Sequence, residues 1–220
     1  MLAVRDEDPQ REWDALGPWW QDRHPGVVGI RDRRAGGAWL AADPARGRLA
    51  VLLNRADVHG LPEDRVVSRG ALVLDAVADR VPSAADGPLP HHGFNLLVVS
   101  PSGVRMLSWD GALLRETPVP PGVHMIAHDD LDDPATARIA RWLPVFRDRV
   151  SAGLAWPEGW IDVLAETATL DPEDDRAIIR DNRPHGYPTQ SLLYCVARVS
   201  PEDGVVLRDE RLPRPGHWDL

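Results

Sequence analysis

Apolar and polar residues alternate along several short runs of the chain, which is the pattern of half-buried β-strands. Residues 38–42 and 48–55 form two such runs on either side of a turn that contains Pro and Gly, and together they predict a β-hairpin. Residues 189–199 alternate in the same way, and 204–212 are the expected partner strand. The sequence therefore predicts two antiparallel hairpins.

A meander of strands is expected in the middle of the chain. Residues 94–100, 104–109 and 112–117 have the composition and alternation of strands, and we expect them to form a second sheet. A further strand is expected over 123–127. The apolar residues 2–4 run directly into charged positions, which indicates the end of a buried strand that emerges at a polar site.

Helices are predicted where apolar residues recur three and four positions apart. Residues 69–81 form one such helix, and the hydroxyl of Ser68 can accept from a free amide of its first turn. A longer helix begins near Pro134, and Pro144 within it predicts a kink or a break. A third helix is expected over 160–168. The apolar face of the longer helix consists of Ile139, Trp142, Leu143, Phe146 and Val150.

Strands and helices follow one another without a regular strand-helix-strand rhythm, which favours an α+β fold of mixed antiparallel sheets covered by helices. A chain of 220 residues is long enough to bury a core of its own. We therefore treat residues 1–220 as one domain that ends in a loose tail over 213–220.

The charge of the chain argues against nucleic acid as a partner. Acidic residues outnumber lysine and arginine by 34 to 25, and the basic residues are scattered rather than gathered into a stripe. All 25 of these basic residues are arginine, a bias that we attribute to a GC-rich, bacterial genome.

The cellular compartment is inferred from cysteine usage and hydropathy. Cys195 is the only cysteine, which excludes an internal disulfide and fits a reducing compartment. No apolar run approaches the roughly 20 residues that span a bilayer, and the first residues lack the pattern of a signal peptide. We expect a cytoplasmic protein without membrane insertion.

Five short motifs follow one another over the first 100 residues. In this order and at these spacings they resemble the NRDE family, the group that includes transport and Golgi organisation protein 2. The resemblance is strong over residues 1 to about 100 and thin afterwards. The motifs are Val4-Arg5-Asp6-Glu7, Gly36-Gly37-Ala38-Trp39-Leu40, Leu52-Leu53-Asn54, Ser68-Arg69-Gly70 and Gly93-Phe94-Asn95-Leu96-Leu97.

The resemblance implies a relationship to N-terminal nucleophile hydrolases, which have a four-layer αββα sandwich. In those enzymes a terminal cysteine attacks an amide carbonyl while its own amine takes the proton. Members of the family usually begin Met-Cys, whereas this chain has Leu2. Either this chain is a relative without the nucleophile, or its first strand lies upstream of Met1. In both cases we expect the chain to lack the first strand of the fold.

The same resemblance assigns roles to the first polar residues. Arg5 and Asp6 match the Arg-Asp pair of the family, in which the guanidinium lowers the pKa of a thiol and the carboxylate holds an amine. An ion pair at a strand end is the alternative interpretation. Asn54 ends an apolar strand, where its amide can bind a substrate carbonyl or the backbone. Asn95 begins a strand, where it can contact a ligand or close a turn.

Tryptophans are the remaining candidates for a ligand site. Trp39 follows two glycines and either packs in the core or forms the wall of a pocket. Trp19 and Trp20 can line a pocket for a flat ligand or fill the core. His91 and His92 are adjacent in a Pro-rich loop and point in different directions, so we expect no metal site there.

Three functions remain open at this point. The first is binding or trafficking of a small hydrophobic metabolite such as haem, which relatives are connected with and which requires no cofactor. The second is hydrolysis of a small amide by a form that carries the upstream cysteine. The third is a catalytically silent scaffold. Because the chain as given begins with Met1 and Leu2, we rank binding first.

Overall fold

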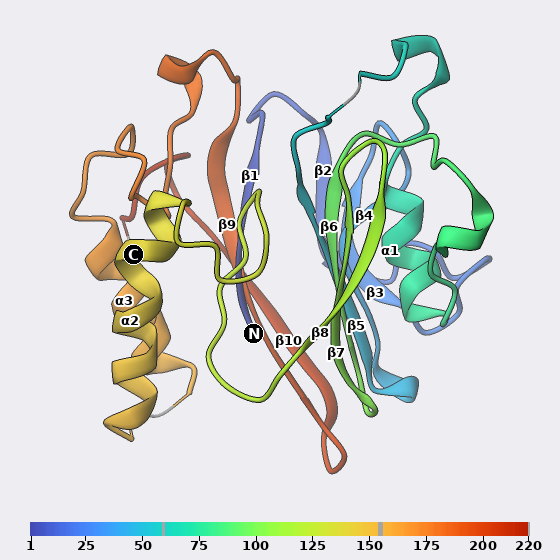
Figure 1. The fold of residues 1–220 in the computed structure, drawn as a ribbon. Coiled ribbons are helices and arrows are strands. Elements are labelled where there is room, and N and C mark those ends of the chain that lie inside the picture. The colour runs from blue at the N-terminus through green and yellow to red at the C-terminus, as the bar shows by residue number, and fades with distance from the viewer. Residues whose placement is uncertain (59, 154–155, 220) are drawn as a thin grey trace.

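Two antiparallel sheets lie face to face in the middle of the molecule, and helices cover the outer side of each (Figure 1). The computed structural model describes residues 1–58, 60–153 and 156–219. Its layers are, in order, helix, sheet, sheet and helix. The predicted α+β class and the αββα sandwich are therefore confirmed.

The larger sheet has seven strands that follow one another in sequence order, each antiparallel to the next. Its first hairpin, predicted from the alternation of residues 38–42 and 48–55, is confirmed. The strands are β2 (Trp13–Gly17), β3 (Val28–Asp32), β4 (Ala38–Asp43), β5 (Arg48–Asn54), β6 (Phe94–Ser100), β7 (Gly103–Trp109) and β8 (Leu114–Val119).

The meander of β6, β7 and β8 was predicted to form a second sheet, and this prediction is wrong. Strand β6 pairs with β5 along its length, from Leu49 opposite Val99 to Asn54 opposite Phe94, so the meander extends the sheet of the hairpin. The connection between these strands crosses the outer face of the sheet and brings β6 back to the edge of β5. Without β6, the buried backbone groups on that edge of β5 would have no hydrogen-bond partners.

Strands β2 and β3 were not predicted, because each is five residues long and interrupted by charged or glycine positions. In β3 only Gly29 and Ile30 are buried. In β2 the buried position is Asp14, whose carboxylate accepts from the guanidinium groups of Arg31 and Arg33. Ion pairs rather than apolar alternation therefore stabilise this edge of the sheet.

The smaller sheet has three strands in the order β1 (Leu2–Glu7), β9 (Gln190–Ser200) and β10 (Gly204–Arg211). The predicted hairpin of β9 and β10 is confirmed by an uninterrupted antiparallel register. Strand β1 pairs with β9 and shifts register between Arg5 and Asp6. The first and last segments of the chain therefore form one sheet.

Strand β1 lies at the edge of the smaller sheet, so some of its backbone groups point towards β9 and the others point away from it. Met1 and Ala197 exchange two hydrogen bonds, of 2.7 and 2.9 Å. Because bonded and non-bonded pairs alternate along an antiparallel ladder, the amide and carbonyl groups of Leu2 and Val4 point away from β9. No described strand pairs with this edge.

Helix α1 (Gly70–Val77) packs on the outer face of the larger sheet, against β4, β5 and β6. As predicted, the Ser68 hydroxyl accepts from an amide at the helix start, that of Gly70, at 3.3 Å. A side chain on Gly37 would lie only 2.5 Å from the Gly70 carbonyl carbon. The glycines at both positions therefore let α1 approach the start of β4 closely.

Helices α2 (Ala137–Ser151) and α3 (Glu158–Thr167) cover the smaller sheet (Figure 1). Helix α2 continues through Pro144, so the break that was one of the two expectations there does not occur. The strand expected over 123–127 is wrong, because these residues are irregular and follow the loop that leads to α2. We call residues 120–136, between β8 and α2, the covering segment.

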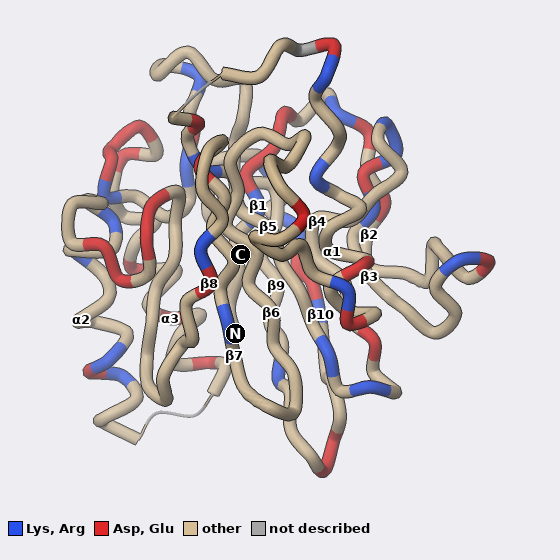
Figure 2. The backbone as a smooth tube through the Cα atoms, turned by 45° about the vertical axis from the view of Figure 1, so that its right-hand side comes forward, with Lys and Arg blue, Asp and Glu red and all other residues tan. Residues whose placement is uncertain are grey.

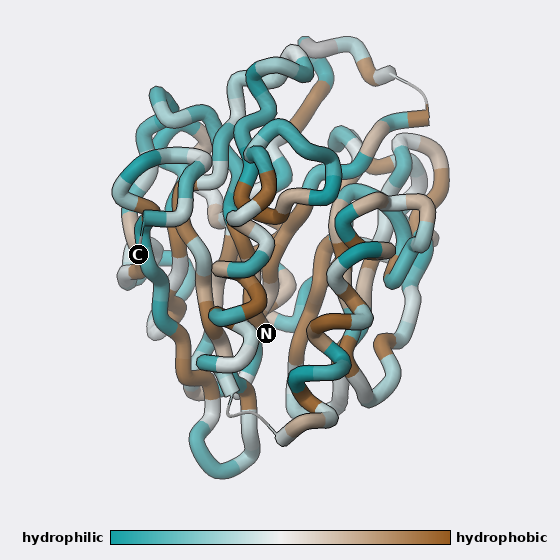
Figure 3. Tube along the Cα trace, turned by 90° about the vertical axis from the view of Figure 1, so that its left-hand side faces the viewer, coloured by the Kyte–Doolittle hydropathy of each residue, from teal (hydrophilic) through white to brown (hydrophobic). Residues whose placement is uncertain are grey.

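The space between the two sheets has a packed half and an open half. In the packed half, β9 lies against β3, β4 and β5 in a cluster of fully buried residues, which are Ile30, Leu40, Val51, Leu193 and Cys195. In the open half, β1 faces β6, β7 and β8 across a cleft. Figure 3 shows the hydrophobic residues along the inner strands, with hydrophilic loops around them.

The C-terminal segment expected to be loose lies against β9. The indole of Trp218 stacks on the Tyr194 ring with 5.5 Å between centroids. The amide of Gly216 donates to the Ser191 carbonyl at 2.8 Å.

Candidate functional site

The open half of the inter-sheet space contains a cleft of about 1270 Å³. Most of its wall is apolar and comes from three layers of the fold. The smaller sheet contributes Leu2 and Val4, the larger sheet contributes Leu97 and Val99, and α2 contributes Phe146. A cleft with these walls suits an apolar ligand, since ligand pockets typically enclose about 300–1,000 Å³ of mainly apolar lining.

Arg5 lines this cleft. Its guanidinium lies 5.2 Å from the ring centre of Trp13 and 6.0 Å from that of Trp39. Its ion-pair partner is Glu7 at 3.4 Å, and the residue is only 2% exposed. Burial lowers the pKa of Arg5, while Glu7 and Asp32 raise it. Cation–π contacts and one ion pair therefore hold Arg5 in place.

Asp6 follows Arg5 across a register shift of β1, and it lines the same cleft. Its carboxylate accepts from the Ser191 hydroxyl at 2.6 Å. Burial raises the pKa of Asp6, and the Ser191 hydrogen bond, Arg138 and Arg180 oppose that shift. The Arg-Asp pair named from the sequence is thus at the cleft, with different partners for each member.

Asn54, proposed as a catalytic position, and Trp39, proposed as a ligand contact, also line the cleft. Asn54 is exposed at the end of β5, and its side chain makes no hydrogen bond to the part of the chain that the structure describes. Trp39 is half-buried on β4 and faces Arg5. The structure therefore brings together Arg5, Asp6, Trp39 and Asn54.

Trp19 and Trp20 lie outside the cleft. Trp19 is 38% exposed, donates to the Ala15 carbonyl at 2.8 Å and contacts the guanidinium of Arg31. Trp20 is buried beneath α1 and donates to the Gly36 carbonyl at 2.8 Å. Their contacts are those of packing residues.

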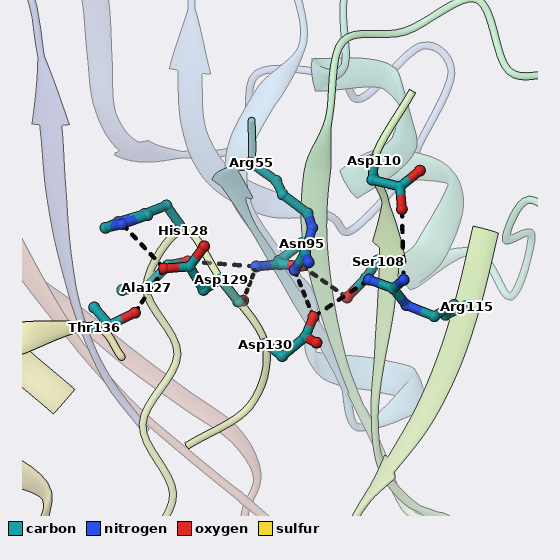
Figure 4. A network of polar contacts seen from close by, with 10 residues as sticks. All are labelled: Arg55, Asn95, Ser108, Asp110, Arg115, Ala127, His128, Asp129, Asp130 and Thr136. Atoms are coloured by element: carbon teal, nitrogen blue, oxygen red, sulfur yellow. Dashed lines mark hydrogen bonds and ion pairs between the residues drawn. The ribbon is translucent and has the colours of Figure 1, made fainter. Parts of the chain in front are cut away.

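Asn95 is buried under the covering segment and does not line the cleft (Figure 4). Its side-chain amide donates to the Asp129 carbonyl at 2.7 Å, and its carbonyl accepts from the Ser108 hydroxyl at 2.7 Å. Arg55 donates to the same side-chain oxygen at 3.4 Å. Asn95 therefore attaches the covering segment to β6.

Ion pairs extend this attachment (Figure 4). Arg55 binds the carboxylate of Asp130 at 2.7 Å, and Arg115 reaches the same carboxylate at 3.4 Å. The Thr136 hydroxyl donates to Asp129 at 2.7 Å. The covering segment is thus held on the larger sheet next to the cleft.

His124 lies in the covering segment and lines the cleft. Its Nδ1 lies 2.7 Å from the Asp132 carboxylate, which also accepts from the Met125 amide and from Arg147. The other ring nitrogen, Nε2, is buried and has no hydrogen-bond partner among the described residues. A histidine oriented by a carboxylate in this way resembles the arrangement of metal-ligating histidines.

The sequence analysis did not propose His124 or Arg138 as cleft residues, although the sequence contains an indication for each. The expected strand over 123–127 obscured His124, although Asp132 follows it at a distance that a loop can close. Arg138 was overlooked beside the apolar face of α2. A basic residue in the first turn of a helix opposes the helix dipole, so its presence there indicates another role.

The charge distribution, the candidate metal ligands and the hydropathy of the helices complete the description of the molecule. Figure 2 shows acidic and basic residues intermingled over the described chain. Among the described residues, no three His, Cys, Asp or Glu side chains are placed to hold a metal ion. None of the described helices is long and apolar enough to cross a membrane.

Comparison with known families identifies the chain. The model of the family Transport and Golgi organisation 2 matches residues 1–175. The chain belongs to this family. The match runs from β1 past the end of α3 and so includes the cleft residues of β1, β5 and α2. None of the curated proteins that were compared matches the chain.

Membership of the Transport and Golgi organisation 2 family confirms the resemblance drawn from the first 100 residues. It extends that resemblance through the covering segment and both outer helices. Within the family match, Arg5 and Asp6 contact the cleft directly, and the Asn95 network supports the segment beside it.

Proposed function

We propose that this protein binds and carries a small hydrophobic metabolite in the cytoplasm, with haem as the first candidate. The observation that carries the proposal is the cleft of about 1270 Å³ between the sheets, whose wall is mainly apolar and also contains polar side chains, among them Arg5, Asp6 and Asn54. Such a cavity accommodates a flat ligand of haem size better than a compact polar substrate. Binding of this kind requires no nucleophile.

His124 supports haem over other apolar ligands. Its Nδ1 is engaged by Asp132, which leaves Nε2 as the nitrogen available for iron. Imidazole is a common axial ligand of haem, and a carboxylate partner raises its basicity. Rotation of the ring or a small shift of the covering segment is needed, because Nε2 is buried in this conformation.

The direct test is titration of the purified protein with haem, followed in the Soret band. The expected result is a saturable shift at micromolar ligand with one haem per chain. A change that rises linearly with haem and does not saturate contradicts the proposal, because it reports non-specific partition.

A variant tests the role of His124. His124→Ala is expected to move the Soret maximum and to weaken haem binding by about tenfold or more, since an axial ligand is lost. His24→Ala is the matched control, because His24 lies outside the cleft. Equal spectra for His124→Ala and the parent protein remove His124 from the proposal but leave the cleft in place.

The unpaired edge of β1 favours a second candidate, amide hydrolysis by a form of the chain with a further strand. A strand paired at Leu2 and Val4 would run beside Arg5 and Asp6, where a terminal cysteine would find the guanidinium and the carboxylate. The coding DNA upstream of Met1 shows whether such a form is encoded. If it is, an amide screen should show turnover that its Cys→Ala variant lacks, and equal rates from both reject hydrolysis.

A further inference from the structure

Arg138 differs from the other arginines that line the cleft. Arg5 pairs with Glu7, Arg11 pairs with Asp32, and Arg198 pairs with Asp203. Arg69 donates to the Gly93 carbonyl at 2.6 Å. Of the cleft arginines in the described part of the chain, Arg138 alone has neither an ion pair within 4.0 Å nor a hydrogen bond.

Three features of its surroundings destabilise the positive charge of Arg138, which has no partner within the described chain to offset them. Its Nε is buried and unbonded among the described residues. Burial lowers the pKa of the guanidinium, and Asp6, which lies beyond ion-pair distance, raises it. Arg138 is also the second residue of α2, where the positive end of the helix dipole repels a cation. An anion from outside the protein would offset all three effects.

The neighbours of Arg138 along α2 indicate what that anion is attached to. Trp142 and Phe146 follow at spacings of four, on the same face of the helix. Phe146 lines the cleft, with Leu2, Trp160 and Leu164 contributing to the same wall. A ligand with its anionic group at Arg138 would therefore place an apolar body along this wall.

We propose that Arg138 binds the carboxylate of an apolar acid held in the cleft. The inference deepens the proposed function and rests on it, because it assigns the head group of the ligand. A carboxylate is favoured over a phosphate dianion, because the nearby Arg180 already pairs with Asp175 and Asp6 opposes a second negative charge next to Arg138. The propionate groups of haem belong to this class, as do fatty acids.

The test compares an acid with its uncharged ester. Parinaric acid, which is fluorescent, and its methyl ester are each titrated into the full chain. The acid is expected to bind about 10- to 100-fold more tightly than the ester, the ratio that a charge-assisted hydrogen bond contributes. Equal affinities for acid and ester overturn the inference while cleft binding stands. No binding of either also overturns the inference, and the haem titration alone then decides the proposed function.

Variants separate recognition of the anion from a structural role. Arg138→Gln is expected to remove the preference for the acid and to leave ester affinity within about twofold, whereas Arg138→Lys keeps part of it. Arg141→Gln is the matched control, since Arg141 is on the exposed side of α2 and contacts the Trp142 ring. Retention of the full acid preference in Arg138→Gln overturns the inference, even if that variant is less stable.

The haem experiment distinguishes the two proposals. Haem failing to bind while parinaric acid binds in an Arg138-dependent way rejects haem as the ligand and supports the carboxylate site. Haem and its dimethyl ester binding equally well supports the proposed function and counts against Arg138.

Discussion

The packed and open halves of the inter-sheet space use the same kind of strand with different results. In the packed half, Leu193 of β9 and Leu40 of β4 are fully buried against each other's sheet. Towards the open half, Leu97 and Val99 of β6 are only half-buried, because each packs on a core cluster on one side and lines the cleft on the other. A three-stranded sheet cannot cover a seven-stranded one, so part of an apolar face borders a cleft.

The difference shows that a ligand cleft here needs no special strand sequence. It arises where the smaller sheet ends at β1, and the covering segment and α2 form its remaining walls. Apolar residues of the same kind therefore belong to the core or to the cleft wall, depending on which element lies opposite them. Four measurements test this difference between the two halves.

The largest expected contrast is in thiol reactivity. Cys195 is fully buried in the packed half, and burial raises the pKa of its thiol, so a thiol reagent is expected to label it only through unfolding. For a stability of about 5 kcal/mol or more, labelling is slowed at least about 10³-fold. Val99→Cys in a Cys195→Ala background is the open-half control and should label rapidly. Fast labelling of Cys195 in the native protein would show that the packed half opens readily.

Leucine truncations measure how much each half contributes to stability. Leu40→Ala should lower the free energy of unfolding by about 2–5 kcal/mol, because it leaves a cavity in the packed half. Leu97→Ala should cost clearly less, since its side chain already borders the cleft. Urea unfolding measures both, and equal losses would mean that the cleft is closed in solution.

The two asparagines proposed from the sequence make a third pair. Asn95→Ala should cost about 1–3 kcal/mol, because it leaves the Ser108 hydroxyl and the Asp129 carbonyl without their buried partner. Asn54→Ala, at an exposed strand end, should change stability little. A loss at position 54 as large as that at 95 would contradict the structural role assigned to Asn95.

The smallest effects are expected from pH, with opposite signs at Asp6 and Asp14. Burial raises the native pKa of Asp6, so its contribution is complete below the usual 3.8 and is lost as pH rises through the native value. Asp6→Asn should therefore gain stability relative to the parent between pH 3.5 and 7. Hydrogen bonds from Arg33 and Arg31 lower the pKa of Asp14, so Asp14→Asn should lose relative stability over the same range. Parallel pH curves for the two variants contradict this assignment.

Much of the fold was predictable because its signals are local. The hairpins of β4 with β5 and β9 with β10 follow from alternation around turns, and α2 follows from its apolar face. Which sheet the β6 meander joins was not predictable, because that depends on a pairing across a long connection. Strands β2 and β3 were missed because ion pairs to Asp14 replace apolar alternation there.

The candidate site was predictable only where a motif marked it. Arg5, Asp6, Trp39 and Asn54 all line the cleft, and their roles there stay a prediction. His124 and Arg138 each have a local signal, but their places at the cleft depend on the path of an irregular segment and on the docking of α2, which those signals do not show. Asn95 was expected to contact a ligand or to close a turn, but it does not line the cleft, and its amide donates to Asp129, 34 residues away in the sequence.

The unpaired edge of β1 bears on how copies of the protein behave towards each other. Exposed strand edges recruit other chains into continuous sheets, a common origin of aggregation. Here the outward groups of Leu2 and Val4 lie on a strand that lines the cleft, between the sheets and under α2. A second molecule would have to place a strand in the cleft to reach them, so a ligand in the cleft would also block recruitment of another chain at this edge.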